Sequence, residues 1–135
     1  MPKLKWGPDL SVYIRIFDEE HQKLIELIDL LIDTILLDKE VKVVNTVVDE
    51  FIKYARAHFK REEDAMQACS FPEFAQHKEE HVQFVDKVIK HKLGFESHIR
   101  TLKNPIIIFI TEWLQNHIIN FDRKYSDLLK KRGYK

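Results

Sequence analysis

The sequence predicts an all-α protein, an up-down-up-down four-helix bundle with an N-terminal arm. Apolar residues recur at helical spacing along most of the chain. Only three glycines and four prolines interrupt its 135 residues. The segments between the helical patterns are short, as in antiparallel bundles. We therefore expect one domain over residues 1–135, with an arm at 1–17 and a bundle at 18–131.

The first two helices are predicted from about Asp18 to Leu37 and from about Val41 to Cys69. Asp18 is a suitable N-cap, because its side chain can accept a hydrogen bond from an unpaired backbone N–H. Pro72 ends the second pattern. The apolar positions are Leu24, Ile25, Ile28, Leu31, Ile32, Ile35 and Leu36 in the first helix, and Val44, Val47, Val48, Phe51, Ala55, Phe59 and Met66 in the second.

The third helix is predicted from about Pro72 to Leu93, with Gly94 as its end. Its apolar face carries Phe74, Phe84, Val85 and Val88.

The fourth helix is predicted to end near Lys131, and its start is open between two alternatives. Asn104 followed by Pro105 fits an N-cap and first helical position. Alternatively, Ser97 caps an earlier start and Pro105 is a kink. Its apolar positions are Ile107, Ile110, Trp113, Leu114, Ile118, Phe121, Tyr125 and Leu128.

The N-terminal arm is apolar enough to lie across the bundle. It carries Trp6, Tyr13, Ile14, Ile16 and Phe17.

Composition excludes several classes of protein. Lysine plus arginine balances aspartate plus glutamate, which disfavours a nucleic-acid or anionic-membrane binder. No apolar run reaches the roughly 18 residues of a transmembrane helix. The N-terminus lacks the apolar core of a signal peptide, and the single Cys69 cannot form an internal disulfide. We expect a cytoplasmic protein.

Polar groups of metal-binding type interrupt the apolar face of every predicted helix. A single histidine on such a face is usually a hydrogen-bonded core residue. Burying two carboxylates without partners, however, costs several kcal/mol each, and few lysines or arginines face inward to neutralise them. A metal centre supplies the missing positive charge. The residues are His21, His58, Glu62, His77, His81, His117 and Asp122.

Part of this set has a second interpretation. The stretch "HKEEH" at 77–81 fits the zinc-peptidase signature H-x-x-E-H, with Glu80 as general base. That interpretation leaves the other five groups unexplained. Five imidazoles and two carboxylates also exceed the four ligands of one zinc ion.

The ligand set suits two first-row metal ions, and imidazole with carboxylate is favourable for iron. Suppose that both carboxylates and one oxide or hydroxide bridge two six-coordinate ions. One coordination position is then left for a small ligand. Oxidase sites of the ferritin type use more carboxylates and Glu-x-x-His pairs, which this sequence lacks. The set therefore favours reversible binding over oxidative turnover.

The segments "FDEEH", "HFKREE", "HKEEH" and "WLQNHIINFD" resemble the hemerythrins, most closely the single-domain bacterial and archaeal kind. The resemblance covers roughly residues 4–130. It implies a non-haem di-iron centre, oxo- or hydroxo-bridged, that binds O2 reversibly. It also implies the ligands of each iron: His77, His81 and His117 for one, His21 and His58 for the O2-binding one, and Glu62 and Asp122 as bridges.

The resemblance also implies an apolar O2 pocket that excludes water and slows autoxidation, and an aromatic residue, Tyr125, near the bridge. Tyr13 departs from the family, since bacterial members usually have glycine there. The pocket residues are Leu24, Phe59, Trp113, Leu114 and Ile118.

The expected function is an O2 carrier, store or delivery protein, not an enzyme, with O2 as the only partner identified. Two alternatives are kept. One is a sensor whose O2 or redox state alters a protein contact. The other is a di-iron enzyme that handles peroxide or nitric oxide.

Overall fold

The computed structural model describes residues 5–37 and 39–133, without the side chains of 95–104. Helices account for all regular structure in these described ranges, so the predicted all-α class is confirmed. The elements are the 3-10 turn η1 (Pro8–Leu10), α1 (Arg15–Leu36), α2 (Val41–Ala68), α3 (Phe74–His117), the π-helical segment η2 (Ile118–Asp122) and α4 (Arg123–Lys131).

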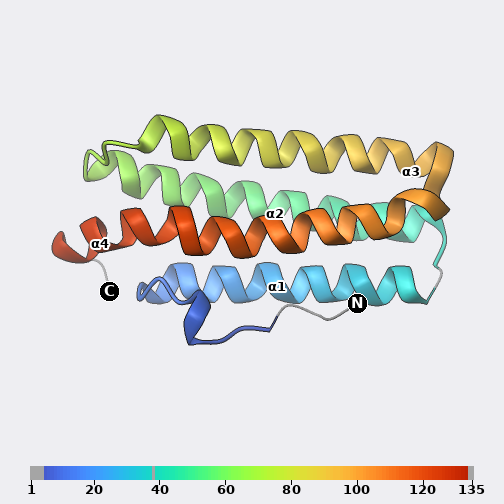
Figure 1. Cartoon of the computed structure of the whole chain (residues 1–135), viewed down its shortest axis with the longest axis horizontal. Coiled ribbons are helices and arrows are strands. Elements are labelled where there is room, and N and C mark those ends of the chain that lie inside the picture. Colours follow the sequence, from blue (N-terminus) through green and yellow to red (C-terminus); the bar gives the residue numbers. More distant parts are fainter. Residues whose placement is uncertain (1–4, 38, 134–135) are drawn as a thin grey trace.

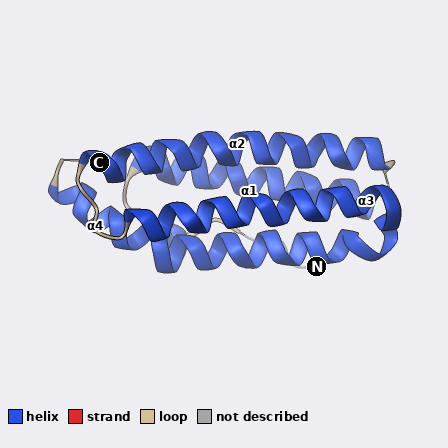
Figure 2. Ribbon diagram, turned by 90° about the horizontal axis from the view of Figure 1, so that it is seen from above, coloured by secondary structure: helices blue, strands red, loops and turns tan. Residues whose placement is uncertain are grey.

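The four rods of the bundle come from α1, α2 and two halves of α3, because α3 reverses its direction (Figure 1). Nε2 of His81 lies 3.0 Å from Nε2 of His117, although 36 residues separate them. A straight α-helix of that length would extend about 54 Å. The returning half continues through η2 into α4, and neighbouring rods run antiparallel (Figures 1 and 2). The predicted four-helix bundle is confirmed.

The predicted start of the first helix was wrong. α1 begins at Arg15, and its N-cap Ile14 has extended backbone and no side-chain cap. Asp18 lies inside the first turn. Its carboxylate accepts hydrogen bonds from the backbone N–H of Val12 (2.8 Å) and the hydroxyl of Ser11 (2.6 Å). Asp18 therefore fixes the arm to the helix instead of capping it.

The predicted end of the third helix at Gly94 was also wrong, because the helical segment continues through Gly94 and Pro105. Glycine inside a helix costs only about 1 kcal/mol relative to alanine, so it weakens a helix without ending it. The capping roles expected of Ser97 and Asn104 fall on side chains outside the described residues. α2 matches its predicted ends within one residue.

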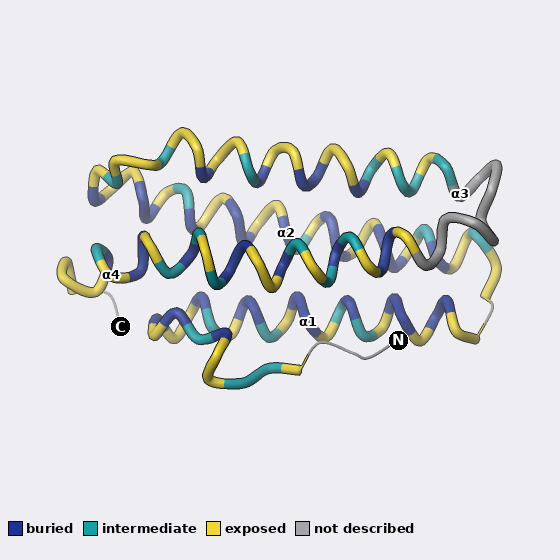
Figure 3. The backbone as a smooth tube through the Cα atoms, in the orientation of Figure 1, coloured by how far each residue is buried: buried dark blue, intermediate teal, exposed yellow. Residues whose placement is uncertain are grey.

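The predicted apolar faces meet in the centre of the bundle, where buried positions turn inward on every rod (Figure 3). The predicted stripe of α2 is buried throughout. Leu36 is an exception in α1, since it is 66% exposed at the helix end. Each fully buried aliphatic or aromatic side chain contributes roughly 1.5–3 kcal/mol to the free energy of unfolding. No described helix is both long and apolar enough to span a membrane.

The arm lies against the bundle beside α1, but not through all the residues expected (Figure 1). Leu10, Val12 and Ile14 are buried, whereas Tyr13 is 63% exposed. The backbone of Tyr13 is in the left-handed region, with a φ of 60°, and its side chain faces outward between two buried neighbours. Ile16 is also exposed, while Phe17 is buried.

Candidate metal centre

Every rod contributes to one buried polar cluster, as the sequence predicted. All seven predicted side chains are buried. Two pairs of these residues, His58 with Glu62 and His77 with His81, are spaced four apart in the sequence. Each pair shares a helix face, because side chains at i and i+4 lie one above the other. The contributors are His21 from α1, His58 and Glu62 from α2, His77 and His81 from the outgoing half of α3, His117 from its returning half, and Asp122 from η2.

The π-helical segment explains how His117 and Asp122 share one face. Five residues of an α-helix would place their side chains about 140° apart around the axis. The wider turn of a π-helix brings the fifth residue closer to the starting face. Nε2 of His117 lies 3.0 Å from Oδ1 of Asp122. The local widening at 118–122 therefore directs the Asp122 carboxylate into the cluster.

The donor atoms form two groups that share both carboxylates. One group is His21, His58, Glu62 and Asp122, and the other is Glu62, His77, His81, His117 and Asp122. Within each group the donor atoms lie within 4.8 Å of one another. Oδ2 of Asp122 is 3.1 Å from Nε2 of His21, and Oδ1 is 3.0 Å from Nε2 of His77. Asp122 thus offers one oxygen to each group.

Several of these atoms lack hydrogen bonds within the described part of the chain. They include Nε2 of His21, Nε2 of His77 and both carboxylate oxygens of Asp122. The atoms are close, yet their geometry is not that of hydrogen bonds, because they converge on shared points. Buried polar atoms without partners are costly. A cation at each point would satisfy them, and the donor set of imidazole and carboxylate suits iron.

Without a metal, protons on histidines balance the carboxylates. Burial lowers the pKa of His58, but the charge of Glu62 and a hydrogen bond to Glu20 raise it overall, to about 10. Burial raises the pKa of Asp122, but His117, His21 and His77 hold it well below its usual range. A histidine must be deprotonated to bind a metal, so metal ions and protons compete for these rings.

Comparison with known proteins identifies the family. The model of the hemerythrin HHE cation binding domain matches residues 12–129. The chain belongs to the hemerythrin family. It is 30% identical to a bacteriohemerythrin of Stenotrophomonas maltophilia over 130 residues (96% of this chain, 84% of that protein). It is 32% identical to a hemerythrin-like protein of Naegleria gruberi over 124 residues (92% of each chain). A wild-type hemerythrin crystal structure superposes with a TM-score of 0.83 and 25% identity, covering 95% of this chain and 98% of that one.

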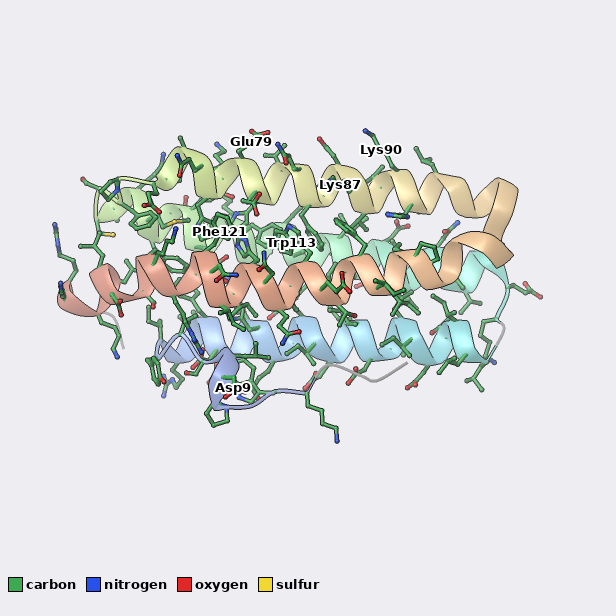
Figure 4. The ribbon with its side chains drawn as sticks, viewed as in Figure 1. Asp9, Glu79, Lys87, Lys90, Trp113 and Phe121 are labelled. Atoms are coloured by element: carbon green, nitrogen blue, oxygen red, sulfur yellow. The ribbon has the colours of Figure 1, made fainter. Side chains whose placement is uncertain are left out.

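Hemerythrin domains bind a di-iron centre, and the buried cluster of this chain fits that cofactor. The zinc-peptidase interpretation of "HKEEH" has no support in the geometry. Glu80 is half-buried and belongs to neither donor group, and Glu79 points to solvent (Figure 4).

Aromatic rings pack against the histidines of the cluster. Phe59 stacks on His81 with centroids 3.9 Å apart, and Trp113 stacks on His117 at 4.3 Å. Trp113 and Phe121 lie along the returning chain, one on each side of His117 (Figure 4). Leu24, Leu114 and Ile118 are buried in the same core, while Trp113 is half-buried. Of the predicted pocket residues, Phe59 and Trp113 thus contact histidines of the cluster directly.

Three further residues beside the cluster were missed by the sequence interpretation. Glu20 and Glu63 bond to the outer ring nitrogens of His58 and His81, at 2.9 and 2.8 Å. Arg61 donates to Glu20. Glu20 precedes the predicted ligand His21, and Glu63 follows the predicted ligand Glu62. This adjacency is the only signal in the sequence that could have pointed to them. Glu20 is buried, although it follows two other acidic residues in the sequence.

Tyr125 connects the cluster to the first turn of α1, where the arm ends. Its hydroxyl donates a hydrogen bond to Oε2 of Glu62, and its ring lies 5.8 Å from that of Phe17. The resemblance implied an aromatic residue near the bridge. The hydrogen bond shows that the partner of this residue, Tyr125, is Glu62.

Proposed function

We propose that the chain binds O2 reversibly at a bridged di-iron centre, as an oxygen carrier, store or delivery protein. The observation that carries this proposal is the pair of buried donor groups sharing Glu62 and Asp122. The proposed ligands are His77, His81 and His117 for one iron, His21 and His58 for the other, and the two carboxylates as bridges.

The centre, when bound, supplies the electrons that O2 takes up and returns. The chain's own residues decide where O2 binds. The group with two histidines offers fewer nitrogen donors than the group with three, so we place O2 at the His21 and His58 side. Leu24, Phe59, Trp113, Leu114 and Ile118 form the proposed pocket, whose apolar surface keeps water and anions away from the reduced iron.

The proposal includes no catalytic turnover. Two carboxylates for five imidazoles make a weakly anionic ligand set, which disfavours high-valent iron. Neither a nucleic-acid nor a membrane partner is proposed, because the net charge is zero and the described helices cannot span a bilayer. A cytoplasmic location, with the buried thiol of Cys69 reduced, belongs to the same proposal.

The test is repeated oxygenation of the anaerobic ferrous protein, followed by visible absorption. We expect colour on exposure to O2, loss of colour on its removal, and the same amplitude over several cycles. Irreversible oxidation within one cycle contradicts reversible binding. Steady-state consumption of peroxide or nitric oxide in the same preparation would instead support the enzyme alternative.

A sensor role is a second candidate, favoured by the contacts of the arm. The path from Glu62 through Tyr125 to Phe17 leads from the cluster to the first turn of α1, next to the arm. Lys130 lies over the ring of Tyr13, and Arg123 donates to the backbone carbonyl of Asp9. Proteolysis of the arm with and without O2 tests this role. Equal cleavage rates in both states contradict it.

A further inference from the structure

Two histidines of the cluster are held from behind by carboxylates that differ in their surroundings. Nδ1 of His58 lies 2.9 Å from Oε1 of Glu20, and Nδ1 of His81 lies 2.8 Å from Oε2 of Glu63. Because an ionised carboxylate only accepts hydrogen bonds, each imidazole donates through Nδ1. Once the rings are neutral, as metal binding requires, Nε2 of each ring presents its lone pair to the cluster.

The carboxylate behind His58 is neutralised by a cation. Glu20 is buried, and Nε and Nη2 of Arg61 both contact its Oε2. Arg61 itself is 45% exposed. A chain of three charged or polar groups thus runs from the cluster to the surface on the side of α1 and α2.

The carboxylate behind His81 has no such cation. Glu63 hydrogen-bonds to His81, and no lysine or arginine of the described residues lies within ion-pair distance of it. Its side chain is 18% exposed, and Arg56, Lys60 and Lys78 line the same pocket without pairing with it. His81 is therefore backed by a carboxylate without a direct cation partner, and His58 by a paired one.

A carboxylate that accepts the Nδ1–H fixes the tautomer of a metal-binding imidazole and makes it a stronger donor. A cation paired with that carboxylate partly neutralises its charge and so weakens this effect. The two carboxylates should therefore act unequally on the two donor groups, since His58 and His81 belong to different ones.

We propose that Glu20, Arg61 and Glu63 are positioning residues that make the two metal positions electronically unequal. Glu63 strengthens His81 as a donor. The Arg61–Glu20 pair keeps the His58 ring in the correct tautomer while limiting its donor strength, which favours the ferrous form at the O2 side. This last step rests on the proposed function, whereas the effects on tautomer and metal affinity do not.

The first experiment uses cobalt(II) and zinc, so it does not depend on O2 binding. Metal affinities by chelator competition are compared for the wild type, Glu63→Gln, Glu20→Gln and Arg61→Gln. Glutamine keeps an oxygen acceptor and removes the charge. We expect Glu63→Gln to lose about 10- to 100-fold in affinity, Glu20→Gln to lose less, and Arg61→Gln to gain affinity because Glu20 regains its full charge.

Matched controls separate contact from distance. Asp64 is the chain neighbour of Glu63, and Glu19 is the chain neighbour of Glu20. Both side chains are largely exposed, so Asp64→Asn and Glu19→Gln each remove a nearby charge that does not contact a histidine. Lys53→Gln removes an exposed cation of the same helix that does not line the pocket beside Glu63. We expect these variants to bind metal as the wild type does. Arg61→Gln should have no effect in the Glu20→Gln background, because Arg61 acts through Glu20.

Nitrogen-15 spectra of the histidine rings in the zinc-loaded protein give the tautomers directly. We expect Nδ1–H in His58 and His81. Equal losses in Glu20→Gln and Glu63→Gln, or an Arg61→Gln effect that persists without Glu20, would overturn the proposal. If a glutamate variant fails to fold, Arg61→Gln and Lys53→Gln still decide the matter, since both change exposed side chains. Autoxidation of the iron protein then tests the last step: it should be faster in Arg61→Gln than in Lys53→Gln.

Discussion

His117 shows how one side chain can serve both the cluster and the core. Its ring is stacked between Trp113 and Phe121 while Nε2 faces Asp122. Replacing it by alanine removes a proposed ligand and opens a cavity beside two aromatic rings. We expect His117→Ala to hold fewer than two iron atoms per chain by metal analysis. His91→Ala is the control, because His91 contacts Phe109 away from the cluster. Full iron content in His117→Ala would show that His117 is not a ligand.

Tyr125 tests the surroundings of the proposed bridge. Burial raises the pKa of its hydroxyl well above the usual value, as do Glu62 and Asp122, so it stays a donor. Tyr125→Phe leaves one oxygen of Glu62 without its partner, which costs about 1–3 kcal/mol of unfolding free energy. We expect the iron to be retained, with a shifted visible spectrum. Tyr54→Phe, at a half-buried position, is the control. A Tyr125→Phe protein with unchanged spectrum and stability would contradict the contact.

At the scale of the elements, the sequence predicted helix boundaries best where the local signals allowed only one interpretation. The α2 boundaries were predicted because a turn precedes Val41 and Pro72 follows Cys69. The sequence placed a reversal between the predicted third and fourth helices, but it did not predict that the helical segment continues through Gly94 and Pro105, which are ordinary stop signals. The π-helical segment was also missed, since apolar spacing does not reveal a local change in hydrogen bonding. The residues of the candidate site were nevertheless brought together as expected, because i, i+4 pairs share a face whatever the helix ends.

The residues behind the ligands could not be predicted in the same way. Glu20 and Glu63 occur in the charged stretches "DEEH" and "REED", in which neighbouring carboxylates differ in burial. Only the packing of α1, α2 and α3 shows which of these carboxylates faces a ring nitrogen.

The junction between the arm and α1 contains a strained position. Tyr13 has a φ of 60°, in the left-handed region that glycine adopts most readily. That conformation costs a non-glycine residue roughly 1–2 kcal/mol. We expect Tyr13→Gly to be about 1 kcal/mol more stable than Tyr13→Ala, since both lose the contact with Lys130 and only glycine relieves the backbone. The test is chemical denaturation, and equal stability of the two variants would contradict the strain.

On the scale of the whole molecule, the cluster links stability to pH and metal. In the metal-free protein the pKa of His58 is raised to about 10, against about 6.5 when unfolded. Its contribution to stability is therefore complete below about pH 6.5 and is lost as the pH rises toward 10. Iron removes the need for this proton. We expect the metal-free protein to lose unfolding free energy between about pH 6.5 and 9, and the iron-loaded protein not to. Parallel denaturant titrations across that range measure both, and a metal-free protein that gains stability would contradict the linkage.

The central claim is that this bundle keeps five imidazoles and two carboxylates in its core because a pair of metal ions binds between them. The most direct measurement is the iron content of the native protein, together with its unfolding free energy before and after the iron is removed. The account predicts two iron atoms per chain and a large loss of stability on their removal. A folded protein that contains no metal and is equally stable after exhaustive chelation would contradict it.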